Sequence, residues 1–363
     1  MSEHDAAVSP LVVSMGDPAG IGPEIIWRAW QRRDASVGAW CVLGHAPSMR
    51  RAAGFLGIDV EHSLRVVQPP QWHEALQQSD LSDSRLLLLA LDESDDVPPV
   101  GQLSATAGRL AARSIECAAG LCLAGRVAGL VTAPIHKQAL AMAGWDVPGH
   151  TEMLQQLAAQ HMGVPISALP VRMMLANPEL QTVLHSIHVS LRDALDAIQP
   201  DALYETLAVT AQHVQPVGDA SDGPRKRLRI AVAGVNPHAG EGGRFGREEI
   251  DVIAPVVALA RAQGWDISGP WAPDTVFMRA RAGEFDVVVA MYHDQGLIPV
   301  KYLGVDHGVN VTLGLPFVRT SPDHGTAMDV AGQGQAREHS LHAALMDARR
   351  RVCRASNASN VPS

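Results

Sequence analysis

Short apolar runs, each followed by a polar or glycine-containing turn, recur along the chain. The clearest run, Phe-Asp-Val-Val-Val-Ala-Met at 285–291, is rich in β-branched residues and predicts a buried strand. Further buried strands are predicted at 9–15, 40–44, 64–67, 127–131 and 228–233. Stretches with helical spacing of apolar residues separate these runs, as in the helix that Ser104 can cap. The alternation predicts an α/β fold with mostly parallel sheets flanked by helices.

Two runs in the middle of the chain predict a pair of neighbouring strands. They span 171–175 and 181–189, and the second carries His185 and His188. Side chains three residues apart on a strand point to opposite faces. Only one of these two histidines can therefore face a given site.

Composition limits the classes of protein that the chain can represent. With 363 residues, 47% of them hydrophobic, the chain can bury the cores of two domains. A net charge of −9 without long charged runs argues against nucleic acid or an anionic membrane as partner. The apolar run 86–91 is too short to cross a bilayer, and residues 1–10 lack the features of a signal peptide. We therefore expect a cytoplasmic protein with four free cysteines and no membrane contact.

Polar residues follow the predicted strand 285–291 directly. His293 and Asp294 emerge at its end, where α/β proteins place their chemistry. Lys301, Asn310 and Arg319 come next, and these side chains are donors that an anionic substrate needs. The plain alternative is a hydrogen-bonded core pair of His and Asp, but it leaves the later donors unexplained.

Two upstream motifs carry similar chemistry. Lys137 ends the polar stretch 132–137 that follows a predicted strand. His150 and Thr151 lie in the motif 149–152, just before a predicted helix whose N-terminus favours anions. Taken alone, Thr151 is better explained as an ordinary helix N-cap than as part of a site.

Several long motifs resemble the 4-hydroxythreonine-4-phosphate dehydrogenase family of pyridoxine biosynthesis. They are Tyr-His-Asp-Gln-Gly at 292–296, Gly-Val-Asn-Val-Thr-Leu-Gly-Leu-Pro at 308–316 and Arg-Thr-Ser-Pro-Asp-His-Gly-Thr-Ala at 319–327. Further motifs of the family occur in order at 16–24, 132–137, 149–152 and 236–243. The resemblance therefore covers nearly the whole chain.

The resemblance implies a two-domain fold like that of isocitrate and isopropylmalate dehydrogenases, with the active site in the interdomain cleft. We expect a cofactor-side domain formed by residues 1–140 plus 320–363. Residues 141–319 are expected to form the domain that binds substrate and metal and makes the dimer.

The same resemblance implies a divalent metal held by His188, His238 and His293. Three neutral imidazoles with an open fourth position suit Zn²⁺ or Co²⁺, and Mg²⁺ less well. In this family the ligands come from two subunits, so a homodimer is implied. Asp274 and Asp294 are candidates to orient an imidazole or to move a proton, and Lys137 is a third candidate for the general base.

By the same resemblance the substrate binds to five residues: His150, Thr151, Lys301, Asn310 and Arg319. The implied reaction is the NAD-dependent oxidation of 4-phosphooxy-L-threonine to 2-amino-3-oxo-4-phosphooxybutanoate. That β-keto acid loses CO₂ to give 3-amino-2-oxopropyl phosphate, in the biosynthesis of pyridoxal 5′-phosphate.

No GxGxxG motif of a Rossmann fold is present. Instead, residues 324–332 resemble the adenosine-binding loop of isopropylmalate and isocitrate dehydrogenases. The cofactor residues implied by this likeness are His324, Gly325, Thr326, Ala327 and Asp329. A carboxylate at Asp329 would accept from the ribose hydroxyls and repel a 2′-phosphate, so NAD is expected in preference to NADP.

Three other functions are consistent with parts of this pattern. A dehydrogenase for D-threonate or D-erythronate 4-phosphate would share these motifs, and Asp17 keeps it open because some members of the pyridoxine branch have Glu there. A metal-dependent phosphoester hydrolase could use the same histidines and donors. The dinucleotide-like loop at 324–332 argues against the hydrolase, and the histidines argue against a non-catalytic sugar-phosphate binding protein.

Overall fold

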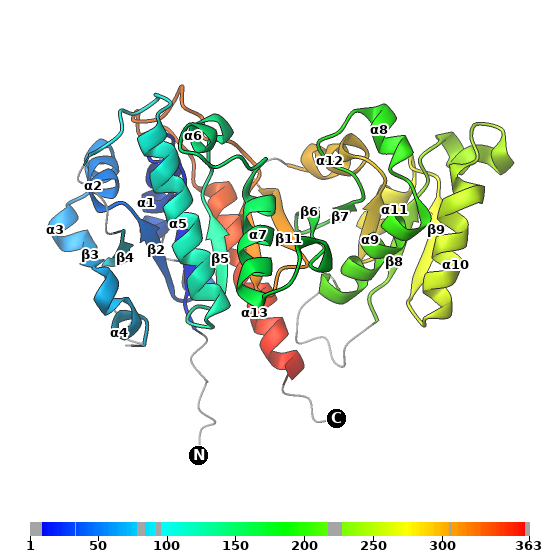
Figure 1. Cartoon of the computed structure of the whole chain (residues 1–363), viewed down its shortest axis with the longest axis horizontal. Helices are drawn as coiled ribbons and strands as arrows, with labels where there is room; N and C mark the ends of the chain where they lie inside the picture. The colour runs from blue at the N-terminus through cyan, green and yellow to red at the C-terminus, as the bar shows by residue number, and fades with distance from the viewer. Residues whose placement is uncertain are drawn as a thin grey trace, which may run out of the picture. The chain divides into compact units, whose positions relative to one another are not determined.

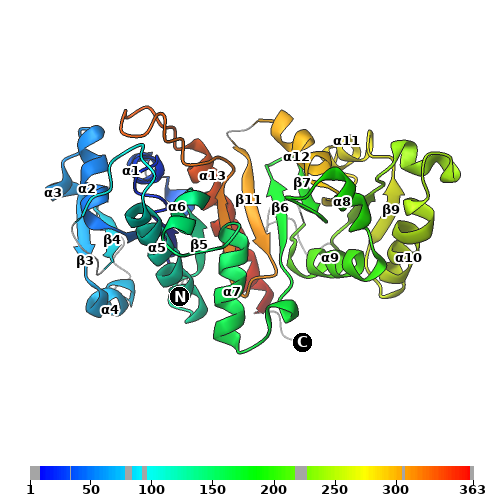
Figure 2. The ribbon, with the colours of Figure 1, turned by 45° about the horizontal axis from the view of Figure 1, so that its top comes forward.

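The computed structural model describes residues 9–32, 34–77, 84–91, 96–216, 227–304 and 307–359. The chain divides into two compact units, which Figure 1 and Figure 2 trace along the chain. The first unit comprises Met1–Ala168 and Leu315–Ser363, and the second comprises Leu169–Gly314. Residues 141–168 lie in the first unit, because helix α7 (His150–Met162) packs against α5 (Ala105–Leu123). The expected assignment of cofactor and substrate roles to two domains stays a prediction.

The first unit contains a parallel sheet with the strand order β3-β4-β2-β1-β5-β12 in its described part. The strands are β1 (Leu11–Ser14), β2 (Trp40–Gly44), β3 (Leu64–Val67), β4 (Leu86–Ala90), β5 (Gly129–Thr132) and β12 (Val318–Pro322). Parallel strands covered by helices on both faces are apolar throughout, which explains why these runs could be recognised in the sequence. β12 is the exception, because its sequence Val-Arg-Thr-Ser-Pro is largely polar.

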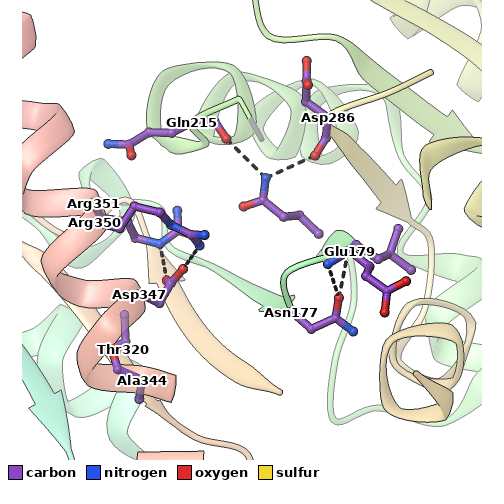
Figure 3. A network of polar contacts seen from close by, with 11 residues as sticks. Asn177, Glu179, Gln215, Asp286, Thr320, Ala344, Asp347, Arg350 and Arg351 are labelled. Atoms are coloured by element: carbon purple, nitrogen blue, oxygen red, sulfur yellow. Dashed lines mark hydrogen bonds and ion pairs between the residues drawn. The ribbon is translucent and has the colours of Figure 1, made fainter. Parts of the chain in front are cut away.

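Helices and short helical turns surround this sheet. Those not yet given are α1 (Gly22–Arg32), α2 (Ala46–Phe55), α3 (Val60–Ser63), α4 (Trp72–Gln77), α6 (Lys137–Met142), α13 (His339–Ser359), η1 (Ala35–Val37), η2 (Pro69–Gln71) and η3 (Ile166–Ala168). Ser104 caps α5 as predicted, its Oγ accepting a hydrogen bond from the amide of Ala107 at 3.1 Å. In α13, Asp347 is buried between Arg350 and Arg351 and accepts from both guanidinium groups (Figure 3).

The second unit contains a mixed sheet with the order β11-β6-β7-β10-β8-β9 in its described part. The strands are β6 (Arg172–Ala176), β7 (Gln181–Leu184), β8 (Ile230–Ala233), β9 (Ile267–Trp271), β10 (Val287–Ala290) and β11 (Val309–Leu313). β7, β10, β8 and β9 are parallel neighbours, whereas β6 runs antiparallel to both β7 and β11. The four parallel strands therefore end at one edge of the sheet.

The remaining elements of this unit are helical. They are α8 (Leu191–Asp196), α9 (Pro200–His213), α10 (Ala254–Ala262), α11 (Val276–Arg281), α12 (His293–Tyr302), the turn η4 (Pro237–Gly243) and the π-helical turn η5 (Glu249–Ile253). The core packs apolar side chains of β7, β8 and β10 against α11 and α12. A Cβ on Gly296 would lie 2.4 Å from Leu184, so only glycine allows α12 to approach β7 this closely.

The second predicted strand of the pair, 181–189, is shorter than expected. β7 ends at Leu184, because the side chains after it bond elsewhere: His185 bonds to Thr206 and to the carbonyl of Ala197, and Ser186 bonds to the carbonyl of Met291. The pairing with β6 is as predicted. His185 and His188 therefore lie on the segment beyond the strand, not on its two faces.

Candidate functional site

In the second unit, four candidate residues follow four neighbouring parallel strands. His188 follows β7, His293 follows β10, His238 follows β8 and Asp274 lies in the turn after β9. The strand order β7-β10-β8-β9 places all four segments at the same edge of the sheet. This is the edge at which open α/β sheets bind ligands.

Two of the three candidate metal ligands lie together. The ring centroids of His188 and His293 are 5.8 Å apart. The Nδ1 atom of His293 lies 2.7 Å from a carboxylate oxygen of Asp294, which is the contact that orients many metal-binding imidazoles and leaves Nε2 for the ion. His185 is different, because Thr206 and the carbonyl of Ala197 occupy both of its ring nitrogens. Between the two histidines of this segment, His188 is the one that contacts the candidate site.

His238 lies in a loop with unusual backbone geometry. His238, Ala239 and Glu241 have φ values of 53°, 53° and 43°, in the left-handed region that residues other than glycine rarely adopt. The buried carboxylate of Glu249 accepts from the amides of Val235 and Asn236 at 2.7 Å each and holds the start of this loop. Strained backbone of this kind clusters at functional sites, where the surrounding structure holds it.

The donor set fits a divalent cation of the Zn²⁺ or Co²⁺ type, since imidazole nitrogens are its usual ligands. Within the described residues no group of three His, Cys, Asp or Glu side chains is close enough to bind a metal ion. Of the three predicted ligands, His188 and His293 are the two whose rings lie close to each other in this chain. Asp274 and Asp294 are both exposed beside this edge.

Two predicted substrate-binding residues also lie in the second unit. Lys301 is half-buried in the last turn of α12, the helix that His293 begins. Asn310 lies on β11, and its Oδ1 atom is shielded from solvent without a hydrogen-bond partner among the described residues. A shielded amide oxygen without a partner is a group that a bound ligand or water would satisfy.

The first unit contains a cationic site around Arg319 of β12. Its side chain is buried, and its Nη2 donates to Oγ1 of Thr132 at 2.7 Å. Burial lowers the pKa of Arg319 to about 10, while the nearby Glu152 carboxylate acts in the opposite direction. The guanidinium is therefore charged at neutral pH.

His150 begins α7 next to this arginine. Burial, and secondarily the charge of Arg319, lower the pKa of His150 well below 6.5, so the imidazole is neutral at neutral pH. Its Nε2 atom is shielded from solvent and has no hydrogen-bond partner in the described part of the chain. Gly149 is the N-cap of α7, so Thr151 lies inside the helix and does not cap it.

Lys137 reaches the same place. A Cβ built on Gly149 would lie 3.5 Å from Oε2 of Glu152 and 4.0 Å from Cε of Lys137. Arg319, Lys137 and the N-terminus of the 13-residue helix α7 thus bring positive charge or N–H donors to one site, which also contains the carboxylate of Glu152. Such a site suits a phosphate or carboxylate group.

The predicted cofactor loop lies against α1 in the first unit. The carboxylate of Glu24 accepts from the amides of Gly332 and Gly334, at 2.5 and 3.0 Å. Ile21 donates its amide to the carbonyl of Thr326 at 3.0 Å. Asp329 is exposed at the surface of this loop, and Ala327 has a positive φ of 41°.

His324 and Gly325 complete the predicted cofactor set. The Nδ1 atom of His324 lies 2.9 Å from the carbonyl of Gly325, and no atom lies within 4 Å of a Cβ built on Gly325. Sequence reasoning missed Glu24 as the residue that holds this loop. The signal in the sequence was that Glu24 is an acidic residue among apolar ones in the first turn of α1, a turn that is buried in the structure.

The family model of the pyridoxal phosphate biosynthetic protein PdxA matches residues 37–348. The chain belongs to the PdxA family. It is 49% identical over 337 residues to the 4-hydroxythreonine-4-phosphate dehydrogenase of Beijerinckia indica, a match that covers 93% of each chain. A D-threonate 4-phosphate dehydrogenase of Pectobacterium atrosepticum is 40% identical, over 91% of this chain and 95% of its own.

Solved structures agree with the PdxA assignment. A crystal structure of 4-hydroxythreonine-4-phosphate dehydrogenase from Klebsiella pneumoniae superimposes with a TM-score of 0.80, at 39% identity, and covers 95% of this chain and 99% of that one. The predicted family and the predicted α/β fold with mostly parallel sheets flanked by helices are confirmed. Both relatives are named as dehydrogenases, so dehydrogenase chemistry is the activity that they share. Among the described residues, no helix has the length and apolar character to cross a membrane.

Proposed function

We propose that this PdxA-family protein is a dehydrogenase that oxidises the C3 hydroxyl of 4-phosphooxy-L-threonine with NAD. The product, 2-amino-3-oxo-4-phosphooxybutanoate, decarboxylates to 3-amino-2-oxopropyl phosphate in pyridoxal 5′-phosphate biosynthesis. The observation that carries the proposal is the buried, charged Arg319 beside the neutral His150 at the N-terminus of α7. A buried guanidinium next to an imidazole nitrogen that has no partner among the described residues suits an anionic ligand, which would share the guanidinium with the nearby carboxylate of Glu152.

Binding of the substrate is assigned to His150, Thr151, Lys301, Asn310 and Arg319. In the first unit, Arg319 offers a planar guanidinium, and His150 and Thr151 offer hydrogen bonds at the start of α7. In the second unit, Lys301 supplies a positive charge and Asn310 supplies an amide whose oxygen is otherwise without a partner. A phosphate monoester and a carboxylate together carry enough negative charge to use both cations.

The metal is assigned to His188, His238 and His293, with Zn²⁺, Co²⁺ or Mg²⁺ as the ion. Bound there, the ion would lower the pKa of the substrate hydroxyl and polarise the carbonyl formed from it. The carboxylate of Asp294 contacts Nδ1 of His293 and orients the ring. The other ring nitrogen, Nε2, then points away from Asp294 and is the one that would bind the ion. The hydroxyl proton would pass to a base for which Asp274, Asp294 and Lys137 are the candidates.

A homodimer with the metal site shared between subunits is part of the proposal. Large apolar side chains are exposed next to two of the histidines: Val189 and Leu191 follow His188, and Ile298 and Tyr302 lie on the helix that His293 begins. Tyr302 is 90% exposed and Ile298 63%. Large exposed apolar side chains on segments that carry the candidate ligands support an interaction surface there.

NAD is assigned to the loop 324–329, with Asp329 accepting from the ribose hydroxyls. The exposed carboxylate of Asp329, the bond between the amide of Ile21 and the carbonyl of Thr326, and the bonds of Glu24 to the segment just after the loop support this assignment. NADP would bring its 2′-phosphate beside a like charge and is therefore the poorer cofactor. We also place the protein in the cytoplasm, where NAD and phosphorylated amino acids are available.

The rival substrate is D-threonate or D-erythronate 4-phosphate, which the Pectobacterium relative's name supports. Initial rates of NADH formation should be measured with each substrate at equal metal concentration. A larger kcat/KM for 4-phosphooxy-L-threonine is expected. A larger value for the threonate ester would reassign the substrate, and phosphate release without NADH formation would make the protein a phosphoester hydrolase.

A further inference from the structure

A buried glutamine bridges the ends of two neighbouring strands in the second unit. Gln295 lies on α12, and its Oε1 accepts from the amide of Met291 at 2.7 Å, directly after β10. Its Nε2 donates to the carbonyl of Gly234 at 2.7 Å, directly after β8. The two backbone segments that Gln295 joins lead into His293 and His238.

Two further buried side chains continue this bridge on either side. Oγ of Ser186 donates to the carbonyl of Met291 at 2.8 Å and so joins the segment that carries His188 to the one that carries His293. On the other side, Glu249 accepts from the amides of Val235 and Asn236, just before His238. We call Ser186, Gln295 and Glu249 the strand-end bridge.

The bridge is needed because the sheet ladder stops before the histidines. Strand-to-strand hydrogen bonds fix the spacing of β7, β10 and β8, and main-chain bonds extend this pairing one residue further, where the amide of His185 donates to Ala290 and the amide of Gly234 donates to Trp271. Each bond of the bridge gives a main-chain amide or carbonyl beyond the strand ends a side-chain partner. The bonds also fix the distances between the three segments from which the histidines project.

We propose that Gln295, supported by Ser186 and Glu249, is a positioning residue for the metal site. It sets the separation of His238 from His293, and its role rests on the proposed assignment of the metal to the three histidines. Partners of this kind around metal ligands typically change metal affinity by about 10- to 100-fold when removed.

The test is the affinity for Co²⁺ of the variant Gln295→Met, which keeps the length of the side chain and removes both hydrogen bonds. Gln181→Met is the matched control. Gln181 is also buried, and its Nε2 donates to the carbonyls of Gln215 and Asp286 at 3.2 and 3.1 Å, two residues that Figure 3 labels. Gln181 is the first residue of β7, so it lies at the end of the strand away from His188.

We expect Gln295→Met to bind Co²⁺ at least about tenfold more weakly and to change the visible absorption of the bound ion. Gln181→Met should lower the melting temperature of the metal-free protein to a similar extent but keep wild-type Co²⁺ affinity. A merely structural glutamine at 295 would lower the melting temperature and leave the Co²⁺ affinity unchanged. That result would overturn the inference.

Two more variants make the outcome unambiguous. Ser186→Ala removes a single hydroxyl and serves if Gln295→Met fails to fold; it should also weaken Co²⁺ binding, and wild-type affinity in Ser186→Ala would then overturn the inference. His238→Ala tests the underlying assignment. If wild type and His238→Ala bind Co²⁺ equally, the metal assignment itself is wrong. If only His238→Ala loses Co²⁺ while the bridge variants keep it, the inference alone fails.

Discussion

Replacing Arg319 by lysine tests the substrate site most sharply. Lysine keeps the positive charge of the side chain but lacks the planar guanidinium with its several N–H donors. In the wild type, Nη2 of Arg319 donates to Thr132 at 2.7 Å, and the guanidinium plane is fixed in a buried site. A lysine ammonium can take the place of one donor only. It therefore either keeps the contact with Thr132 or presents its hydrogen bonds to the substrate.

The expected cost follows from the bonds lost. A hydrogen bond between a charged donor and an anion contributes about 1.5 to 3 kcal/mol. Lysine replaces only part of the hydrogen bonds of the guanidinium, so transition-state binding should weaken by about 1 to 3 kcal/mol. Because about 1.4 kcal/mol corresponds to tenfold, kcat/KM should fall by about 5- to 150-fold. The loss should be seen mainly for phosphorylated substrates.

The assay is the initial rate of NADH formation over a range of substrate concentrations. Arg349→Lys is the control: Arg349 is also buried in the first unit, where it donates to the carbonyls of Val37 and Ala39. That variant should lower the melting temperature and keep kcat/KM. Unchanged kcat/KM in Arg319→Lys, or an equal fall in both variants, would refute the assignment of Arg319 to the substrate.

Three further predictions concern the metal, the cofactor and pH. Chelation should abolish turnover, and added Zn²⁺, Co²⁺ or Mg²⁺ should restore it. The variant His238→Ala should lose both the bound metal and turnover, while its circular dichroism spectrum should show that it stays folded. NAD should be preferred over NADP by at least about tenfold, or about 1.4 kcal/mol, and Asp329→Asn should narrow that ratio of kcat/KM values. Because the pKa of Arg319 is about 10, its positive charge is present below that pH and lost above it, so kcat/KM in a pH profile should fall as pH rises through about 10.

Each of these expectations has a clear contrary result. Full activity in metal-free protein would remove the metal from the reaction. A cofactor ratio that Asp329→Asn leaves unaltered would show that NAD binds elsewhere. A pH profile that stays flat through pH 10 in a protein that remains folded would mean that Arg319 keeps its charge there and that burial does not lower its pKa to about 10.

Strands buried on both faces were the most predictable part of the fold. β2 and β3 have the limits that the apolar runs predict, because parallel strands packed against helices are rich in apolar residues, although β3, at the end of the strand order, also contains Arg65. β11 and β12 could not be recognised in this way. They carry Asn310 and Arg319, and such polar residues break the apolar pattern of a buried strand.

The candidate site was predictable only in part, and for a similar reason. Position after a strand indicates His293 and Asp294, but the choice of His188 and His238 among 16 histidines came from the family resemblance. Gln295 and Glu24 act through main-chain amides and carbonyls of distant segments. No local pattern of residue types reports such contacts, so these residues could be found only in the folded chain.

The central claim is that one divalent cation binds His188, His238 and His293 at the carboxyl ends of β7, β8 and β10. Anomalous diffraction from crystals of the protein grown with Co²⁺ tests it most directly. The account predicts one strong cobalt peak within bonding distance of a nitrogen from each of the three histidines, with the partner subunit supplying those that one chain does not. A cobalt peak at other residues, or no specific peak in an active enzyme, would contradict it.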